Sequence, residues 1–246
     1  MDGVRSFGKK QVILLTGCIN PEGMLFTKLQ DPQARKRQYI DAISFYLKTT
    51  TLPILFVENS GIDISGRFCE EIFKKRLEII TFNGNGYDKR LGKGYGEMII
   101  IEKALQDSVF LKQADFVFKI TGRYKLLNFK AFINQYEKKD CAELMVDLKQ
   151  QLSYADSRFW GSTTHFLSEM LLKYKDEIND SASFYFEHAL FYASHEAISK
   201  KCSFLHFKYM PRLKGISGTE NKKGHHSFVY WSLLNFKQLI KYKFFS

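Results

Sequence analysis

The sequence is poor in cysteine, proline and tryptophan, and it has no long apolar run. Its 246 residues include four cysteines, four prolines and two tryptophans. The apolar stretch near its start, VILLTG, is too short for a signal-peptide core or a membrane span, which predicts a soluble cytoplasmic protein. The cysteines form no CxxC pair and no cysteine–histidine cluster with zinc spacing, so reduced thiols are expected at Cys18, Cys69, Cys141 and Cys202.

The chain also lacks internal repeats, low-complexity tracts and a proline- or serine-rich linker. Nothing therefore marks a domain boundary, and 246 residues fit one large α/β domain. Hydrophobic residues make up 45% and charged residues 26%, which supplies a packed core and gives no compositional case for disorder.

Acidic residues are outnumbered by basic ones, 26 to 37, and the formal net charge is +11. This excess favours an anionic partner: nucleic acid, the inner face of an anionic membrane or a phosphorylated substrate. Charge alone does not choose among them, because lysines also keep a protein soluble.

Short apolar runs alternate with helical periodicity in the first half of the chain. Strands are expected at 11–15, 52–57, 77–82 and 115–120, and helices at 31–47, 66–76 and 98–105. This alternation predicts an α/β fold with a doubly wound, mostly parallel sheet of Rossmann type. The second half predicts a strand at 143–148, helices at 165–175 and 184–200, a strand at 204–210, a polar loop at 214–226 and a basic aromatic helix at 227–245.

Residues just after the strands are the first candidates for a ligand site, because ligands of doubly wound sheets bind beyond the carboxyl ends of the strands. These candidates are Thr16, Gly17, Glu58, Asn59, Gly84, Gly122 and Arg123.

A glycine-rich segment, Gly92–Glu97, precedes the helix at 98–105. Its alternate glycines let a backbone approach a ligand closely, and Lys93 beside Gly94 can meet phosphate charge. The spacing fits neither a Walker A loop nor the dinucleotide fingerprint. We interpret the segment as part of a nucleotide pocket; a plain flexible turn before a helix is the alternative.

Two cations flank the turn after the fourth strand. Lys119 and Arg123 lie on either side of Gly122, an arrangement that suits a diphosphate. A buried lysine inside a strand is costly unless it meets an anion. The alternative is that Lys119 points to solvent and Arg123 caps a helix.

Six segments between residues 12 and 226 form a recognisable combination: TGCIN, DPQARKRQYIDAISFYL, LPILFVENSG, GKGYGE, DFVFKITGRY and ADSRFWGSTTHF. Together they resemble bacterial glycosyltransferases of capsule and O-antigen (lipopolysaccharide) biosynthesis. The resemblance implies a GT-A-like, hexosyltransferase-like enzyme that moves a sugar from a nucleotide-sugar donor to a glycan hydroxyl. It also implies a nucleotide-binding half at 12–130 and an acceptor-side half at 131–246.

Many enzymes of that fold hold a divalent metal with an Asp-x-Asp motif at the end of a central strand, where this chain has TGRY at 121–124. Asp115 is a weak substitute, because it precedes the strand. Lys93, Lys119 and Arg123 would then neutralise the leaving diphosphate in place of a metal. The metal requirement is left open, and no metal-ligating residue is predicted.

Two clusters suit the acceptor side. Asp156 and Arg158, followed by two aromatic rings, would bind sugar hydroxyls and stack on a sugar face; an ordinary ion pair before core aromatics is the alternative. Glu187 follows aromatic residues at the start of a helix, where desolvation raises a carboxylate pKa and suits a general base. It resembles in place the acidic residue on a late helix of inverting GT-A enzymes. The alternative is a carboxylate that favours the helix dipole.

The last two predicted elements, a loop and a helix, each have two possible roles. The loop at 214–226 can close over a diphosphate or be a solvated surface loop, and His225–His226 alone make no metal site. The helix at 227–245 combines lysines with large apolar residues. It can rest on an anionic membrane that carries lipid-linked acceptors, or pack on the core and expose its lysines.

Two other functions compete with glycosyl transfer. A nucleotidyltransferase would use the same phosphate chemistry but normally needs metal-binding carboxylates, which TGRY lacks. A nucleic-acid-binding module would explain the charge, yet the basic residues are scattered and no RNP, KH or helix-turn-helix signature is present. We therefore expect a nucleotide sugar and a glycan or lipid-linked glycan as partners, and no nucleic acid.

Overall fold

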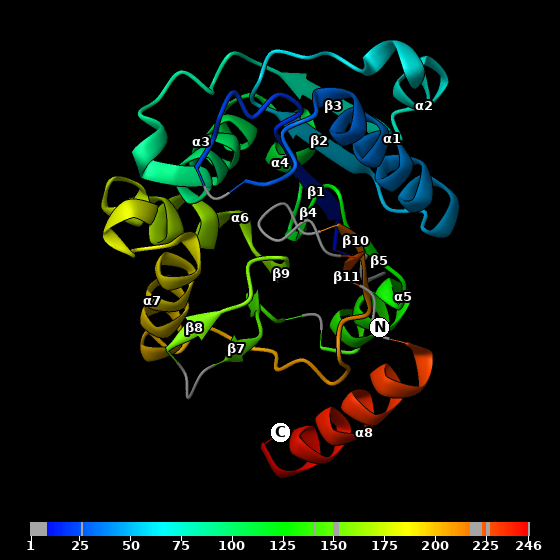
Figure 1. Ribbon diagram of the computed structural model, residues 1–246. Coiled ribbons are helices and arrows are strands. Elements are labelled where there is room, and N and C mark those ends of the chain that lie inside the picture. Colours follow the sequence, from blue (N-terminus) through cyan, green and yellow to red (C-terminus); the bar gives the residue numbers. More distant parts are fainter. Residues whose placement is uncertain are drawn as a thin grey trace, which may run out of the picture.

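A six-stranded sheet runs through the centre of the molecule (Figure 1). The computed structural model describes residues 9–25, 27–139, 141–149, 153–216, 223–224 and 227–245. The strand order is β3-β2-β1-β4-β9-β6, and the first four of these strands are parallel, which confirms the predicted mostly parallel α/β sheet. The parallel strands are β1 (Gln11–Gly17), β2 (Ile54–Glu58), β3 (Leu77–Thr81) and β4 (Phe116–Thr121).

The other edge of the sheet departs from the prediction. Strand β9 (Phe159–Ser162) is antiparallel to both β4 and β6 (Leu144–Met145). It is not predicted from the sequence, because it is short and carries a glycine at its third position. The strand predicted at 143–148 divides into β6 and β7 (Leu148–Lys149), and β7 pairs with β8 (Tyr154–Ala155) in a separate ribbon.

Strand β1 is buried along its whole length, because both faces of the sheet are covered. Ile13 and Leu15 belong to one hydrophobic cluster, and Val12 and Leu14 belong to the other. Burial on both faces explains why the strand reads as a continuous apolar run rather than as an alternating pattern.

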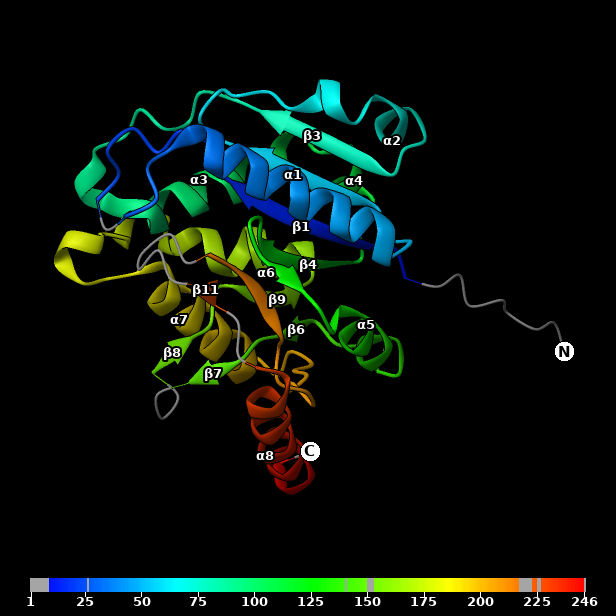
Figure 2. The same ribbon diagram turned by 45° about the vertical axis from the view of Figure 1, so that its right-hand side comes forward.

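Helices cover both faces of the sheet, as a doubly wound fold requires (Figure 2). Helix α1 begins where the Asp31 side chain accepts a hydrogen bond from Gln33 N–H at 2.9 Å, with Pro32 in the first turn. One face is covered by α1 (Pro32–Thr49) and α5 (Phe129–Glu137). The other is covered by α3 (Gly92–Asp107), α4 (Val109–Lys112), α6 (Thr164–Phe166) and α7 (Phe186–Ser199).

Two predicted helices are less regular than expected. The helix predicted at 66–76 is a short turn at Ser65–Arg67 followed by α2 (Cys69–Phe73). The helix predicted at 165–175 begins as α6, continues as a π-helical turn at Leu167–Leu171 and ends as a tighter turn at Leu172–Glu177.

The segment 204–210, all of which is described, forms no strand, so that prediction is wrong. Phe204 makes an isolated bridge at its start. Further along, the Gln135 side chain donates to His206 O at 2.6 Å and accepts from Lys208 N–H at 3.2 Å. A side chain thus takes the backbone hydrogen bonds that a neighbouring strand would need.

A three-stranded sheet, β11-β10-β5, consists of β5 (Lys125–Leu126), β10 (Leu213–Ile216) and β11 (Lys223–Gly224). The loop predicted at 214–226 therefore starts as a strand, and its residues 217–222 and 225–226 lie outside the described residues. The last predicted helix is confirmed as α8 (Phe228–Phe245). In the part of the chain that the structure describes, no helix has the length and apolar character to cross a membrane.

Candidate functional site

A cleft of about 260 Å³ lies where the neighbouring strands β1 and β4 end. The strand order reverses here: from β1 the chain steps outward to β2 and β3, and it then crosses the sheet to reach β4 on the other side of β1. Doubly wound sheets bind ligands at such a switch point. The lining includes Thr16, Gly17 and Cys18 from the end of β1 and Thr121, Arg123 and Tyr124 from the end of β4.

The structure brings most of the predicted site residues together. Those that line the cleft are Thr16, Gly17, Asn59, Lys93, Gly94, Arg123 and Glu187. Those that are not among the lining residues are Glu58, Gly84, Lys119, Gly122 and Asp156. Contact of any of these residues with a ligand stays a prediction.

Glu58 and Arg35 hold the backbone that follows β1. The fully buried carboxylate of Glu58 accepts hydrogen bonds from the N–H groups of Ile19 at 2.7 Å and Ile62 at 3.0 Å. The Arg35 guanidinium donates twice to Cys18 O, at 2.8 and 2.6 Å. Glu58 therefore supports the rim of the cleft from behind, while Arg35 lines it.

Two of the predicted glycines lie where chain segments approach closely. Gly122 N–H donates to Thr16 O at 2.9 Å, and a Cβ at position 122 would lie 2.6 Å from that oxygen. A Cβ at Gly17 would lie 2.6 Å from the ring of Phe56. Both glycines thus have a packing reason that is independent of any ligand.

The glycine-rich segment Gly92–Glu97 was expected to precede a helix, but it forms the first turns of α3. That expectation is therefore corrected. Gly92 has a φ of 81°, which L side chains rarely adopt, and a Cβ there would lie 2.1 Å from Asp180 Oδ2. A Cβ at Gly94 would lie 3.0 Å from Phe186 N. The glycines let two other segments pack closely against the start of α3.

A carboxylate occupies the N-terminal end of α3. Asp180 accepts hydrogen bonds from the N–H groups of Lys93, at 3.1 Å, and Gly94. Burial raises the pKa of Asp180 to about 6; the Lys93 ammonium opposes this rise, and the charge of Glu187 adds to it. The N–H groups that could have bound a phosphate already have an acidic partner.

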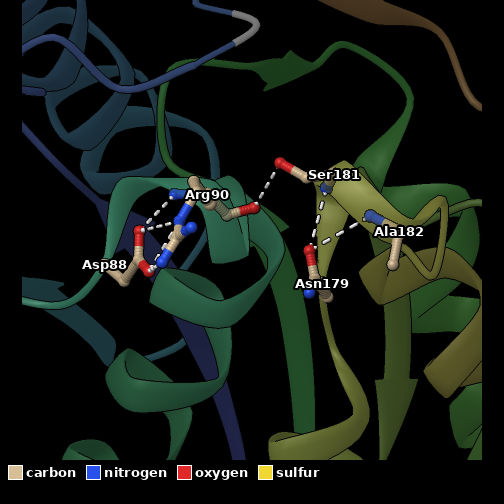
Figure 3. Close-up of polar contacts among 5 residues, drawn as sticks. All are labelled: Asp88, Arg90, Asn179, Ser181 and Ala182. Carbon is tan, nitrogen blue, oxygen red and sulfur yellow. Dashed lines mark hydrogen bonds and ion pairs between the residues drawn. The ribbon is translucent and has the colours of Figure 1, made fainter.

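The turn that carries Asp180 is tied to the turn before α3 (Figure 3). Asn179 Oδ1 accepts hydrogen bonds from Ser181 N–H at 3.0 Å and Ala182 N–H at 3.1 Å. Ser181 Oγ donates to Arg90 O at 2.8 Å. These bonds position the Asp180 carboxylate against the helix. Nothing in the sequence pattern around Asp180 predicted this role.

Lys119 and Glu97 form an ion pair at the base of the cleft. Lys119 is fully buried in β4 and also donates to Ser157 O at 2.8 Å. Glu97 lines the cleft from α3 and accepts from Thr16 Oγ1 at 2.8 Å. The alternative of a solvent-facing Lys119 is wrong. Glu97 was not predicted as a site residue, although a buried lysine signals that an anion must lie nearby.

Cationic side chains converge on the cleft from three elements. Arg35 comes from α1, Lys93 from α3 and Arg123 from the turn after β4. Burial lowers the pKa of Lys93; the charges of Asp180 and Glu187 oppose this, while Arg123 and Arg35 lower it further. These groups therefore lie within electrostatic range of one another. A net anionic ligand would relieve the repulsion among the cations.

Glu187 lies in the first turn of α7 and lines the cleft. Its carboxylate accepts hydrogen bonds from Ser157 Oγ at 2.7 Å and from the Tyr154 hydroxyl. Burial, together with the negative charge of Glu187, raises the pKa of Tyr154, so its phenol stays protonated as a donor. Two hydroxyl groups thus orient this carboxylate.

Asp156 is held by two cations. Its carboxylate is 2.6 Å from Arg158 Nη2 and 2.5 Å from Lys149 Nζ. Burial alone would raise the pKa of Asp156, but the hydrogen bond from Arg158 and the charges of both cations hold it well below its usual range. Asp156 is therefore a weak base, while Arg158 reaches the cleft. The predicted sugar stacking by Phe159 and Trp160 is wrong, because both rings are buried in the core.

Three carboxylates line the cleft, and each accepts a hydrogen bond from the protein: Glu97, Asp180 and Glu187. Among the residues that the structure describes, no three His, Cys, Asp or Glu are grouped so that they could hold a metal ion.

No protein-family model matches the chain, and no curated protein matches it in sequence. Solved structures match it in fold at low identity. A protein assigned as a nucleotide-diphospho-sugar transferase from Desulfovibrio desulfuricans G20 is 10% identical, with 81% of this chain and 80% of that chain covered and a TM-score of 0.46. The inositol-1-phosphate CTP transferase of T. maritima is 10% identical, with 81% and 85% covered and a TM-score of 0.45. Mouse xyloside xylosyltransferase 1 is 10% identical, with 81% and 84% covered and a TM-score of 0.38. At this level of likeness, none of these proteins identifies the reaction of this chain.

Proposed function

We propose that this chain is a nucleotide-dependent transferase that moves a sugar from a nucleotide-sugar donor to a hydroxyl of a surface-glycan acceptor. The observation that carries the proposal is the cleft at the switch point, where Lys93, Arg123 and Arg158 lie together with the carboxylate of Glu187. Converging cations suit a diphosphate, and a neighbouring carboxylate suits the removal of a proton from an acceptor hydroxyl.

The donor side of this proposal is the rim formed by the end of β1. Gly17, Tyr39 and Asn59 line this part of the cleft, and the Tyr39 hydroxyl accepts a hydrogen bond from Cys18 N–H at 2.9 Å. Backbone and polar side-chain atoms that are held in place by hydrogen bonds suit a base and a ribose. We assign the nucleoside to this end of the cleft.

The diphosphate would lie beside Lys93 and Arg123. Transfer breaks the bond between the anomeric carbon of the sugar and the phosphate oxygen, and that oxygen leaves with its electron pair on the nucleoside diphosphate. Arg123 offers a fork of donors to this developing charge, and Lys93 offers a point charge. We propose that Lys119 contributes indirectly, because its own charge is already balanced by Glu97.

The acceptor oxygen would bond to the anomeric carbon while Glu187 takes its proton. Ser157 and Tyr154 donate to Glu187 and would hold it in position for this step. Tyr185 and Arg158 line the same part of the cleft and are partly exposed, so they are available to an incoming sugar. The assignment of the acceptor to a capsular or lipopolysaccharide glycan rests on the resemblance of the sequence segments.

The experiment that tests this function is a thermal-shift panel of UDP-, GDP-, CMP- and dTDP-sugars, with Mg²⁺, with Mn²⁺ and with EDTA. A selective ligand stabilises the folded chain by mass action. We expect one nucleotide class to raise the melting temperature, and Arg123→Ala to abolish this rise. Arg67→Ala, at an exposed arginine outside the cleft, is the matched control and should keep it. No shift with any donor, in the presence or absence of metal, would refute the proposal.

A nucleotidyltransferase is the second candidate, because the cations that converge on the cleft would equally suit the phosphates of a nucleoside triphosphate. Such an enzyme would join a nucleoside triphosphate to a phosphorylated sugar and release pyrophosphate. The two reactions are separated by their products. Release of a nucleoside diphosphate from a nucleotide sugar supports glycosyl transfer, whereas release of pyrophosphate from a nucleoside triphosphate supports the second candidate.

A further inference from the structure

Helix α8 has one face that is fastened to the rest of the protein. Trp231 Nε1 donates to Met210 O at 3.0 Å, and Asn235 Oδ1 accepts from Met210 N–H at 2.9 Å. Gln238 Nε2 donates to Phe207 O at 2.6 Å. Residues spaced by four and three positions lie on the same side of a helix, so these three side chains define the docked face of α8.

The opposite face of α8 is apolar and open to solvent. Its exposed apolar side chains follow one another at intervals of four, three, four and four positions. At 3.6 residues per turn, this spacing places them in one apolar stripe along the helix. In both views α8 lies at the periphery of the molecule, away from the central sheet (Figures 1 and 2). The members of this apolar stripe are Val229, Leu233, Phe236, Ile240 and Phe244, with exposures of 70, 65, 64, 42 and 80%.

Lysines border the apolar stripe. The helical period places Lys237 and Lys241 along one border and Lys243 along the other. The helix contains no aspartate or glutamate. Its outer surface therefore combines apolar side chains with cations at the edges, a pattern that complements the acyl chains and the negative headgroups of an anionic bilayer.

We propose that α8 binds the surface of an anionic lipid bilayer, with the apolar stripe at the boundary of the acyl chains and the lysines against the headgroup phosphates. The docked face fixes α8 to the core, so the whole protein would be held at the membrane by this one helix. This proposal does not depend on the transfer reaction. If both hold, membrane binding brings the cleft to acceptors that are anchored in lipid.

A second copy of the chain fits the apolar stripe less well. Two α8 helices packed stripe to stripe would bring the bordering lysines near one another, and the helix has no acidic residue to pair with them. The net charge of +11 adds repulsion between two copies. The headgroups of an anionic bilayer, in contrast, carry the charge opposite to that of these lysines and attract them.

The test is co-sedimentation of the full chain with vesicles of phosphatidylglycerol and phosphatidylcholine, and with vesicles of phosphatidylcholine alone. We expect binding to the anionic vesicles that weakens as the salt concentration rises, and much weaker binding to the neutral ones. Each of Lys237→Gln, Lys241→Gln and Lys243→Gln should lower the affinity about fivefold, since a lysine near an anionic surface contributes about 1 kcal/mol.

The apolar contribution is tested with Leu233→Ser/Phe236→Ser, which should lower the affinity by roughly tenfold or more. The matched control is Phe73→Ser/Val109→Ser, at two exposed apolar residues outside α8, which should leave vesicle binding unchanged. Unchanged melting temperatures and circular dichroism spectra show that the variants fold. The proposal is overturned if the full chain ignores anionic vesicles. It is equally overturned if the full chain is a dimer in solution that Leu233→Ser/Phe236→Ser converts to a monomer.

Discussion

Lys119 on β4 and Glu97 on α3 form an ion pair that connects the centre of the sheet to the cleft. The Lys119 side chain is 1% exposed and that of Glu97 is 18% exposed, so the pair spans from the core to the ligand site. Thr16, near the end of β1, donates to the same carboxylate at 2.8 Å. Glu97 thereby joins the two central strands to the helix that carries Lys93.

Lys119→Met should lower the free energy of unfolding, because it leaves the Glu97 carboxylate without its cation in a poorly hydrated place. We expect a loss of about 3 kcal/mol, at the lower end for a broken buried pair because Glu97 is partly exposed. Urea denaturation measures it. The double variant Lys119→Met/Glu97→Leu should recover most of the loss, since neither charge remains. A double variant as unstable as the single one would show that the packing of lysine matters more than its charge.

Gly92→Ala should lower the stability of the folded chain for two reasons, both of which come from the added Cβ. The residue has a φ of 81°, and an added Cβ would lie 2.1 Å from Asp180 Oδ2. The backbone strain costs about 1–3 kcal/mol, and the displaced carboxylate would lose its place at the start of α3. Thermal unfolding measures the effect. Gly66→Ala is the matched control, because its Cβ meets no atom within 4 Å and its φ is not in the left-handed region.

Asp180 should make the stability of the chain depend on pH. Its pKa is raised by burial to about 6, from an ordinary value of 3.8, so the folded state keeps this proton at pH values where the unfolded state loses it. The contribution is complete below about pH 4 and is lost as the pH rises through about 6, with an amplitude of roughly 2–3 kcal/mol. Asp180→Asn removes this titration. Urea denaturation measures the free energy of unfolding of both chains across this range. As the pH rises from about 4 to above 6, the variant should gain stability relative to the parent chain. A difference between the two chains that does not change with pH would contradict the assignment.

The centre of the fold was predictable from the sequence, whereas its edge was not. Strands β1 to β4 are covered on both faces, so each reads as a short, largely apolar run that ends at a turn. Strand β9 is short, and Gly161 within it lies against the rings of Phe116 and Phe118, a relationship that only the folded chain reveals. The segment 204–210 looked like a strand because it is apolar, but Gln135 takes its backbone hydrogen bonds.

The candidate site was predictable as a place rather than as a set of contacts. Residues at strand ends converge because of the topology, and this placed Thr16 and Arg123 in the cleft. The partners of buried charges were not predictable, since Asp180 is remote in sequence from the helix that it caps. The Gly92–Gly96 pattern was expected to precede a helix as part of a nucleotide pocket, whereas it forms the first turns of α3 and its glycines allow close packing.

Glu187→Gln tests whether this carboxylate removes the proton of the acceptor hydroxyl. The amide keeps the size of the side chain and can still accept hydrogen bonds from Ser157 and Tyr154, but it cannot take a proton. If Glu187 is the base, kcat for transfer should fall by roughly 100- to 10,000-fold, the usual contribution of general base catalysis. The donor-induced thermal shift should remain, because the cations are untouched.

The matched control for this prediction is Glu169→Gln, at an exposed carboxylate that does not line the cleft. It should leave kcat unchanged. Ser157→Ala should give a smaller loss than Glu187→Gln, because it removes only one of the two hydroxyl groups that orient the carboxylate. A Glu187→Gln enzyme that keeps its kcat but binds donor poorly would instead place Glu187 on the donor side of the cleft, and the proton would have to leave through another group.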